Sequence, residues 1–376
     1  MTLIDRYVLR LFVKVLLVCF FSIAGLFIVV DAFSNVDEFV ACAKQSGGAG
    51  AVLWNFYSAR MLSLFNFSSG LLVLVAGMFT ITWLHRTNEF TALMAAGLPK
   101  FRIVAPLLIA ATIVSLLNAA SRELLIPRFR DELSRGWREL AGEYQEPVSP
   151  KYDNETNVWF DGKHVDDQRR EIIEPTLMLP FAIRGVGKQL TAAVATYRPP
   201  AADQPEGYLL TGVNQAALRE EPSLRLGERV VVYSPKDTPW LQPDQAFIAS
   251  HLTYTHLTAD KAWRQWSSSR QLIGALQNPS VDFGRNVRVA VHSRFVKPLL
   301  DVTLLFLGLP LVLSARKRSV FAAAGICFLL VSAFYVVVLC CQMLGSNWLI
   351  SPALAAWCPV MIFTPVAYAN SIALWQ

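Results

Sequence analysis

The residue types that carry enzymatic chemistry are present in this chain, but their spacing matches no known catalytic arrangement. Residues 185–188 (GVGK) come closest to a phosphate-binding loop, yet they lack the GxxxxGK[ST] spacing and the serine or threonine after the lysine. None of the five histidines forms an HExxH pair, and His251 and His256 point to opposite faces of a strand-like stretch. Ser267–Ser269 has no nucleophile-elbow context and predicts a helix cap. We therefore expect no enzymatic activity, metal site or cofactor in this chain.

Charged side chains inside apolar stretches are another mark of chemistry, because they line ion and proton paths in membranes. Asp31 and Asp301 are expected near the outer ends of predicted helices, where a carboxylate reaches interfacial water. Lys14 can extend its ammonium group to the opposite surface. Because no acid or base is expected near the middle of a helix, a proton-coupled carrier is not favoured.

The composition is that of a polytopic membrane protein. Hydrophobic residues make up 54% of the chain and charged residues only 16%, which is too apolar for an ordinary soluble domain. The net charge of +6 first reports topology in such a protein, and it gives no reason to expect nucleic-acid binding. The polar middle of the chain contains none of the six cysteines, which excludes a disulfide framework or a cysteine zinc site there.

Six apolar stretches are long enough to cross a bilayer, which takes about 20 residues. They are Leu11–Phe33, Met61–Leu84, Ile103–Ala120, Pro298–Ser314, Val320–Leu344 and Trp348–Ala369. Pro298 is expected at the start of its helix, where its missing N–H has no cost. The predicted fold is a polytopic α-helical membrane protein with six transmembrane helices, three on either side of a polar insert.

Lysines and arginines near the helix ends set the predicted orientation. With a cytoplasmic N-terminus, one side of the membrane receives Arg6, Arg10, Lys14, Arg86, Lys100, Arg102, Arg316, Lys317 and Arg318. The short loops of the other side hold Lys44, and Arg60 lies near the start of the second helix. Both termini are therefore expected in the cytoplasm and the polar insert on the far side.

The polar insert, roughly residues 122–297, has the size of one domain. Its first part, Arg122–Tyr144, is charged and helix-like and is expected to extend the third helix. Short β-type runs separated by turn residues follow, which predicts a sandwich or jelly roll. They are Thr156–Phe160, Glu171–Leu179, Ala192–Tyr197, Tyr208–Val213, Arg229–Tyr233 and Ala246–Leu257. Ser267–Leu276 is expected to be helical, and the domains are 1–121, 122–297 and 298–376.

The loop after the second predicted helix contains a short helix of its own, over residues 87–97, which we call the docking helix. Thr87 is suited to cap its start, and Glu89 in the first turn complements the helix dipole. Gly97 and Pro99 supply the stop.

One apolar stripe runs along the docking helix. Phe90, Leu93, Met94 and Gly97 follow the i, i+3, i+4, i+7 spacing of a single helix face. An isolated helix of this length is only marginally stable in water. Its apolar face is therefore expected to pack against another surface. That surface is either the bilayer and the protein's own helices or a cytoplasmic partner.

Several motifs resemble the lipopolysaccharide export permeases of the LptF/LptG (YjgP/YjgQ) family. They are Ile4-Asp5-Arg6-Tyr7 with Arg10; Asn88-Glu89 with 93–97 (LMAAG) and Pro106; and His292-Ser-Arg294 through Pro298, with Gly308, Pro310 and Arg316–Ser319. The plan of three helices, an outside β domain and three helices also matches the family.

The resemblance implies a permease subunit in the inner membrane, with cytoplasmic termini and an inserted periplasmic β-jellyroll-like domain. It implies pairing with a second permease, the same or related, above a dimer of a separate ABC ATPase that hydrolyses the ATP. The substrate would be lipopolysaccharide or a related glycolipid, passed to a periplasmic bridge, and a single-helix periplasmic accessory protein could join the complex. The implied ATPase-coupling residues are Arg86, Glu89, Phe90, Leu93, Met94 and Gly97.

Two positions depart from the family pattern. Family members often carry lysines in the outer half of the first helix, where this chain has Ile28 and its neighbours, and a proline in the second helix, where it has Asn66. The lipid-binding candidates are therefore Asp31, Lys44 and Arg60. The alternative function from another class is a membrane-anchored assembly or scaffold protein whose outside β domain binds a partner.

Overall fold

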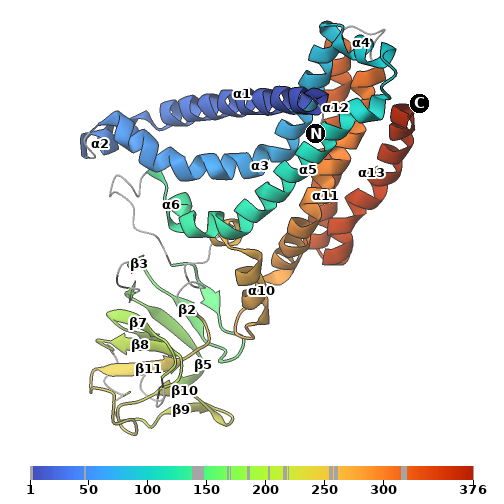
Figure 1. Cartoon of the computed structure of the whole chain (residues 1–376). Coiled ribbons are helices and arrows are strands. Elements are labelled where there is room, and N and C mark those ends of the chain that lie inside the picture. Colours follow the sequence, from blue (N-terminus) through green and yellow to red (C-terminus); the bar gives the residue numbers. More distant parts are fainter. Residues whose placement is uncertain are drawn as a thin grey trace. The chain divides into compact units, whose positions relative to one another are not determined.

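The computed structural model describes the chain except residues 1–2, 46–47, 138–147, 167–168, 170, 184–186, 202–203, 215–217, 219, 254–256, 258–260, 315–319 and 376. The basic turn at 316–318, residue 256 and part of the 185–188 stretch therefore lie outside the described residues. The chain divides into two compact units (Figure 1). The helical unit comprises Met1–Leu133 and Gly284–Gln376, and the β unit comprises Ser134–Phe283. The β unit begins and ends inside the 122–297 segment expected from the sequence.

Long helices form the helical unit, joined by short ones. The bounds in its first half are α1 Leu3–Ser34, α2 Val36–Gln45, α3 Ala49–Arg86, α4 Glu89–Ala95, α5 Lys100–Leu124, the 3₁₀ turn η1 Ile126–Phe129 and α6 Arg130–Ser134. The second half contains α11 Gly284–Ser314, α12 Val320–Ser346 and α13 Pro352–Trp375. Among the described residues, α1, α3, α5, α12 and α13 contain stretches long and apolar enough to cross a membrane. Helix α11 is 31 residues long but carries Arg294, Lys297 and Asp301, so the count of six spans remains a prediction.

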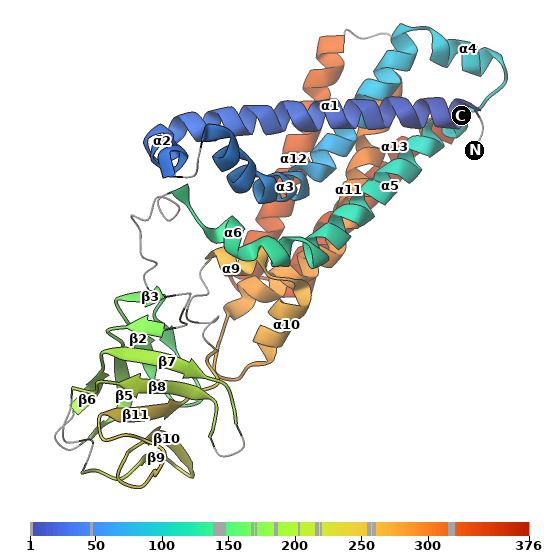
Figure 2. The ribbon, with the colours of Figure 1, turned by 60° about the vertical axis from the view of Figure 1, so that its left-hand side comes forward.

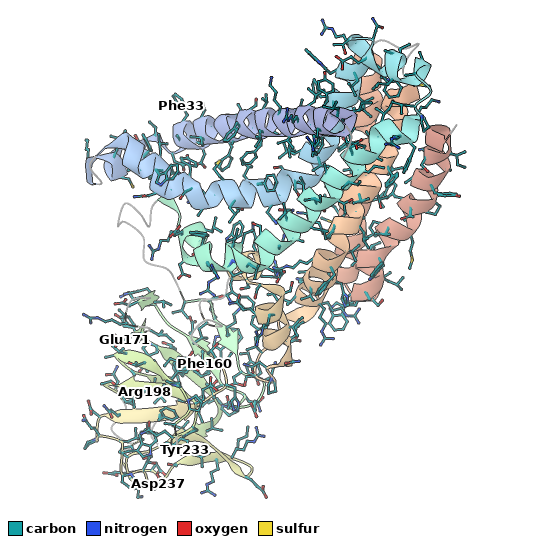
Figure 3. The ribbon with its side chains drawn as sticks, in the orientation of Figure 1. Phe33, Phe160, Glu171, Arg198, Tyr233 and Asp237 are labelled. Carbon is teal, nitrogen blue, oxygen red and sulfur yellow. The ribbon has the colours of Figure 1, made fainter. Side chains whose placement is uncertain are left out.

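All of these long helices contribute to one apolar core, which includes Phe12 of α1, Leu72 of α3, Ile103 of α5, Leu304 of α11 and Phe334 of α12. Helix α1 packs against α3 and α5 and buries only a narrow stripe of its own surface. Its other apolar side chains are exposed, as Phe33 near its end illustrates (Figure 3). So much exposed apolar surface suits lipid rather than water.

Two expectations about helix bounds are wrong. Pro298 lies inside α11, fourteen residues after Gly284, and does not start the helix. A spanning helix tolerates an internal proline where neighbouring groups satisfy the freed carbonyl. The extension of the third helix is also broken, because α5 ends at Leu124 and continues only as η1 and α6.

Two antiparallel sheets form the β unit. The strands are β1 Lys151–Tyr152, β2 Trp159–Asp161, β3 His164–Asp166, β4 Glu171–Ile173, β5 Thr176–Ile183, β6 Gly187–Thr191, β7 Val194–Arg198, β8 Gly207–Thr211, β9 Leu224–Leu226, β10 Arg229–Tyr233 and β11 Gln245–Ala249. Their orders among the described residues are β1-β2-β5-β6 and β3-β4-β7-β8-β11-β10-β9. Each predicted run overlaps at least one strand, but the run Ala246–Leu257 is a strand only as far as Ala249, and its residues 254–256 lie outside the described part of the chain. Strands β1, β3, β6 and β9 were not predicted.

Both sheets bury residues in a single core, as expected for a sandwich. Phe160 of β2 (labelled in Figure 3) and Leu177 of β5 share this core with Tyr208 and Ile248 of the larger sheet. The centres of the Phe160 and Tyr208 rings lie 5.3 Å apart. Two helices follow the strands, α9 Lys261–Trp266 and α10 Ser269–Gln277. The predicted cap is confirmed, because Ser268 forms a capping box at the start of α10.

Candidate functional site

The docking helix forms where the sequence predicts it, as α4, but it begins differently. Asn88 precedes Glu89 in the left-handed conformation, with φ 61°, which asparagine tolerates better than most residues. The expected capping role of Thr87 is wrong, because Thr87 closes α3 and its hydroxyl donates a hydrogen bond to the Trp83 carbonyl at 3.0 Å. Gly97 has φ 83° and ends the segment, as predicted.

The apolar stripe of α4 is divided between two surroundings. Phe90 is 3% exposed, lies 4.3 Å from the His85 ring and belongs to the core of the helical unit, against which Leu93 also packs. Met94 and Gly97 are exposed, as is Arg86 at the end of α3. The protein's own helices therefore anchor one side of α4, and the other side is open to a partner.

Glu89 connects α4 to the first helix. The Tyr7 hydroxyl of α1 donates a hydrogen bond to the Glu89 carboxylate, which is half-buried. Helix α4 and both ends of the chain lie at one end of the helical unit (Figure 2), which we call the α4 end. A displacement of α4 would therefore act on α1 through a polar contact as well as through apolar packing.

Two of the three lipid-binding candidates meet near α2, at the end of α1. The Tyr57 hydroxyl of α3 donates a hydrogen bond to Asp31 at 2.7 Å. One turn further along α3, the Arg60 guanidinium lies 3.4 Å from the centre of the Phe56 ring. Lys44 lies exposed on α2. The structure thus brings Asp31 and Arg60 to one part of the α1–α3 contact.

A group of buried polar side chains lies between α3, α5 and α11, and the sequence reasoning missed it. We call this group the polar cluster; its buried members are Asn66, Ser69, Ser115, Asn118 and Asp301, and its half-buried members are Arg122 and Lys297. The Asn66 amide donates to the Asn118 side-chain oxygen at 2.9 Å, and the Asn118 amide donates to Ser69 at 2.7 Å. Arg122 donates to the Asn66 side-chain oxygen at 3.0 Å, and Lys297 donates to the Asn66 carbonyl.

Asp301 is the acidic member of the polar cluster, and its expected position at a helix end is wrong. It lies near the middle of α11, is 8% exposed and accepts a hydrogen bond from Ser115 at 3.1 Å. Lys297 lies one turn away and attracts it electrostatically. The i, i+4 spacing of Lys297 and Asp301 is a signal for this proximity, but a helix that begins at Pro298 leaves Lys297 outside it.

The β unit has its own charged group beside a pocket of about 270 Å³. The Glu155 carboxylate accepts hydrogen bonds from His251, at 2.6 Å, and from Arg229. Burial raises the pKa of Glu155, but these two hydrogen bonds and their charges together hold it below its usual value. His251 is a surface side chain, as expected, and the described residues contain no group of three or more possible metal ligands.

Together, long apolar helices around a bundle core and an inserted antiparallel β unit define a polytopic membrane protein. The family model for the lipopolysaccharide export system permease LptF/LptG matches residues 6–166 and 213–374 of this chain. The chain therefore belongs to the LptF/LptG family and is a multi-pass permease of the inner membrane. No curated protein matches it.

Proposed function

We propose that this chain is the permease subunit of an ATP-driven exporter that extracts lipopolysaccharide or a related glycolipid from the inner membrane. A dimer of a separate ABC ATPase binds on the cytoplasmic side, and a second permease, the same or related, pairs with this one. The lipid passes to a periplasmic bridge through the β unit, with a single-helix accessory protein as a further partner. The observation that carries this proposal, beside family membership, is α4, which is anchored on one side and exposed on the other.

In this proposal the α4 end faces the cytoplasm and the β unit lies in the periplasm. The bias of basic residues supports this orientation, since Arg6, Arg10, Arg86, Lys100 and Arg102 all belong to the α4 end. The ATPase contacts Arg86, Met94 and Gly97 on the exposed side of the docking helix. Phe90 and Leu93 transmit its displacement to the core, and Glu89 transmits it to α1 through Tyr7.

The glycolipid enters beside α1, whose apolar side chains are mostly exposed. Its phosphate groups meet Arg60 and Lys44 near α2, and Asp31 positions the α1–α3 contact through Tyr57. These basic residues take the place of the lysines that family members often carry on the first helix.

Charge reversal of Glu89 tests the proposal. Glu89→Arg is expected to abolish glycolipid export in cells that depend on this permease, with the amount of protein in the membrane unchanged. Glu132→Arg is the matched control, because it reverses an exposed charge in the first turn of another short helix, α6, away from the α4 end. Full export by Glu89→Arg, or an equal loss in the control, would count against the proposal.

A third variant separates the contact between Glu89 and Tyr7 from the proposed role of Glu89 in ATPase coupling. Tyr7→Phe removes the hydrogen bond from α1 and leaves the carboxylate in place. We expect ATPase co-purification to persist in Tyr7→Phe and to fall in Glu89→Arg. If no ATPase co-purifies with the wild-type permease, the scaffold function gains support instead.

A further inference from the structure

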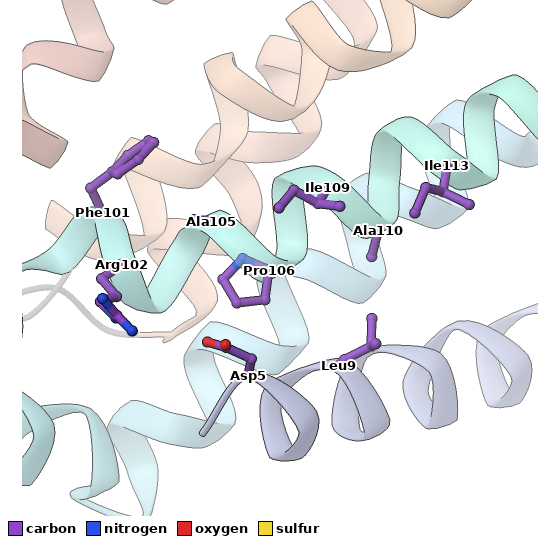
Figure 4. A pocket seen from close by; sticks show the side chains of 9 residues that line it. All are labelled: Asp5, Leu9, Phe101, Arg102, Ala105, Pro106, Ile109, Ala110 and Ile113. Carbon is purple, nitrogen blue, oxygen red and sulfur yellow. The ribbon is translucent and has the colours of Figure 1, made fainter. Parts of the chain in front are cut away.

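A groove of about 410 Å³ runs between the start of α1 and the first half of α5 (Figure 4). Leu9 of α1 and Ile109 and Ile113 of α5 form its apolar walls, and both isoleucines are more than half exposed. Its charged groups are Asp5 and Arg102, both at the α4 end. The volume lies within the range of about 300–1,000 Å³ that is usual for small-molecule sites.

Pro106 explains part of the polarity at the charged end. It lies inside α5 and lines the groove, and its ring nitrogen carries no hydrogen. The carbonyl of Arg102, four residues earlier, therefore cannot receive the usual intrahelical hydrogen bond. The same residue thus brings to this end of the groove a guanidinium donor and a carbonyl that lacks its usual intrahelical donor.

The length of the groove matches one leaflet of a bilayer. From Arg102 to Ile113 the helix rises about 16 Å at 1.5 Å per residue. Half of a hydrocarbon core of about 30 Å is about 15 Å. An amphiphile with its headgroup at Arg102 would therefore lay an acyl chain along Ile109 and Ile113 as far as the bilayer centre.

The charges at the groove end select the headgroup. A phosphate accepts hydrogen bonds from a guanidinium, and such charge-assisted bonds are about twice as strong as neutral ones. A primary ammonium donates to carboxylate and carbonyl oxygens, which Asp5 and the Arg102 main chain provide. Acid and base together fit a zwitterion better than a purely anionic headgroup, which the Asp5 carboxylate would repel.

We propose that this groove binds one phospholipid of the cytoplasmic leaflet with a phosphoethanolamine headgroup. The phosphate lies on Arg102, the ammonium lies between Asp5 and the Arg102 carbonyl, and one acyl chain follows the apolar wall of α5. The assignment to the cytoplasmic leaflet rests on the orientation given under the proposed function. The bound lipid fills the space between α1 and α5 and is distinct from the exported glycolipid.

The test is lipid retention by the full-length permease in nanodiscs that contain equal amounts of phosphatidylethanolamine and phosphatidylglycerol. After transfer to detergent, native mass spectrometry reports the lipids that remain bound. We expect one retained phosphatidylethanolamine for each chain, in preference to phosphatidylglycerol. Equal retention of both lipids, or retention of neither, would overturn the proposal without any variant.

Matched variants locate the lipid. Ala105→Trp fills the groove and is expected to prevent retention, whereas Ala120→Trp on the exposed side of the same helix is not. Arg102→Gln is expected to reduce retention about tenfold, the size expected for one hydrogen bond to a charged group, and Lys100→Gln to leave it unchanged. Unchanged retention in Ala105→Trp and Arg102→Gln would overturn the site.

A photo-crosslinker at Ile109 identifies any other occupant, because capture of a polypeptide of the exporter in place of lipid would also overturn the proposal. Lipid retention is measured without ATP or export. Its outcome is therefore independent of the Glu89→Arg experiment, so the lipid-binding proposal and the proposed function can each be refuted without the other.

Discussion

Removal of the Asp301 carboxylate should destabilise the helical unit strongly. Asp301→Leu keeps the branched shape of the side chain but leaves the half-buried Lys297 ammonium without its opposing charge, and it removes the acceptor of the Ser115 hydroxyl. Removal of the charge that compensates a buried charged group costs about 3–5 kcal/mol when that group is fully buried. Lys297 keeps its hydrogen bond to the Asn66 carbonyl, so we expect a loss of about 3 kcal/mol, at the lower end of that range.

The assay is reversible unfolding of the full chain in mixed micelles by increasing fractions of SDS, followed by circular dichroism. Asp131→Leu on α6 is the matched control, because its carboxylate is 77% exposed and its loss should cost less than about 0.5 kcal/mol. The double variant Lys297→Met/Asp301→Leu should recover most of the lost stability, since apolar side chains often replace charged ones in a protein interior without cost. A single variant as stable as the control, or a double variant less stable than the single, would refute this reasoning.

Further predictions concern the β unit of the full-length chain. Gly207→Ala should destabilise it by about 1–3 kcal/mol, because the added methyl group would collide with the Ile248 carbonyl, and amide hydrogen exchange of residues 207–211 should accelerate. Gly274→Ala in α10 has open space and should instead stabilise the helix by about 0.5–1 kcal/mol; destabilisation there would contradict the argument. Because the pKa of Glu155 is lowered in the folded chain, its contribution to stability is present above its ordinary value of 4.5 and is lost as the pH falls below it. Glu155→Gln should therefore make the protection of residues 229–233 from hydrogen exchange less dependent on pH between about 5 and 3, and an unchanged pH profile would contradict this.

Much of the fold follows from local patterns. Long apolar stretches place α1, α3, α5, α12 and α13 because a spanning helix must hide its own backbone from lipid. Strand β10 falls on Arg229–Tyr233, as the β-branched run predicts. The start of α11 was missed because its first turns are polar, and polar residues at the end of a spanning helix look like a loop in the sequence.

The sequence predicts the candidate site only where its structure depends on residues that are close together in the chain. Gly97 indicates the end of α4 through its own backbone freedom, and the stripe containing Phe90 and Met94 follows from helical spacing. Spacing gives no information on which part of a stripe packs inward, so the burial of Phe90 beside exposed Met94 needed the structure. The hydrogen bond from Ser115 to Asp301 joins residues that are 186 positions apart in the sequence. The spacing of residues within a helix cannot predict such a contact.

The hydrogen bonds of the polar cluster can form in a defined order while the chain is being synthesised. The hydrogen bonds from Asn66 to Asn118 and from Asn118 to Ser69 join α3 to α5. All residues that form these two bonds have therefore been synthesised once translation reaches Leu124, the end of α5. Translation of the stretch from Leu124 to Gly284 takes roughly 8–30 s at 5–20 residues per second. During that interval α3 and α5 can pair in the bilayer with these amides satisfied, and α11 then inserts its Lys297 and Asp301 against a polar surface that already exists.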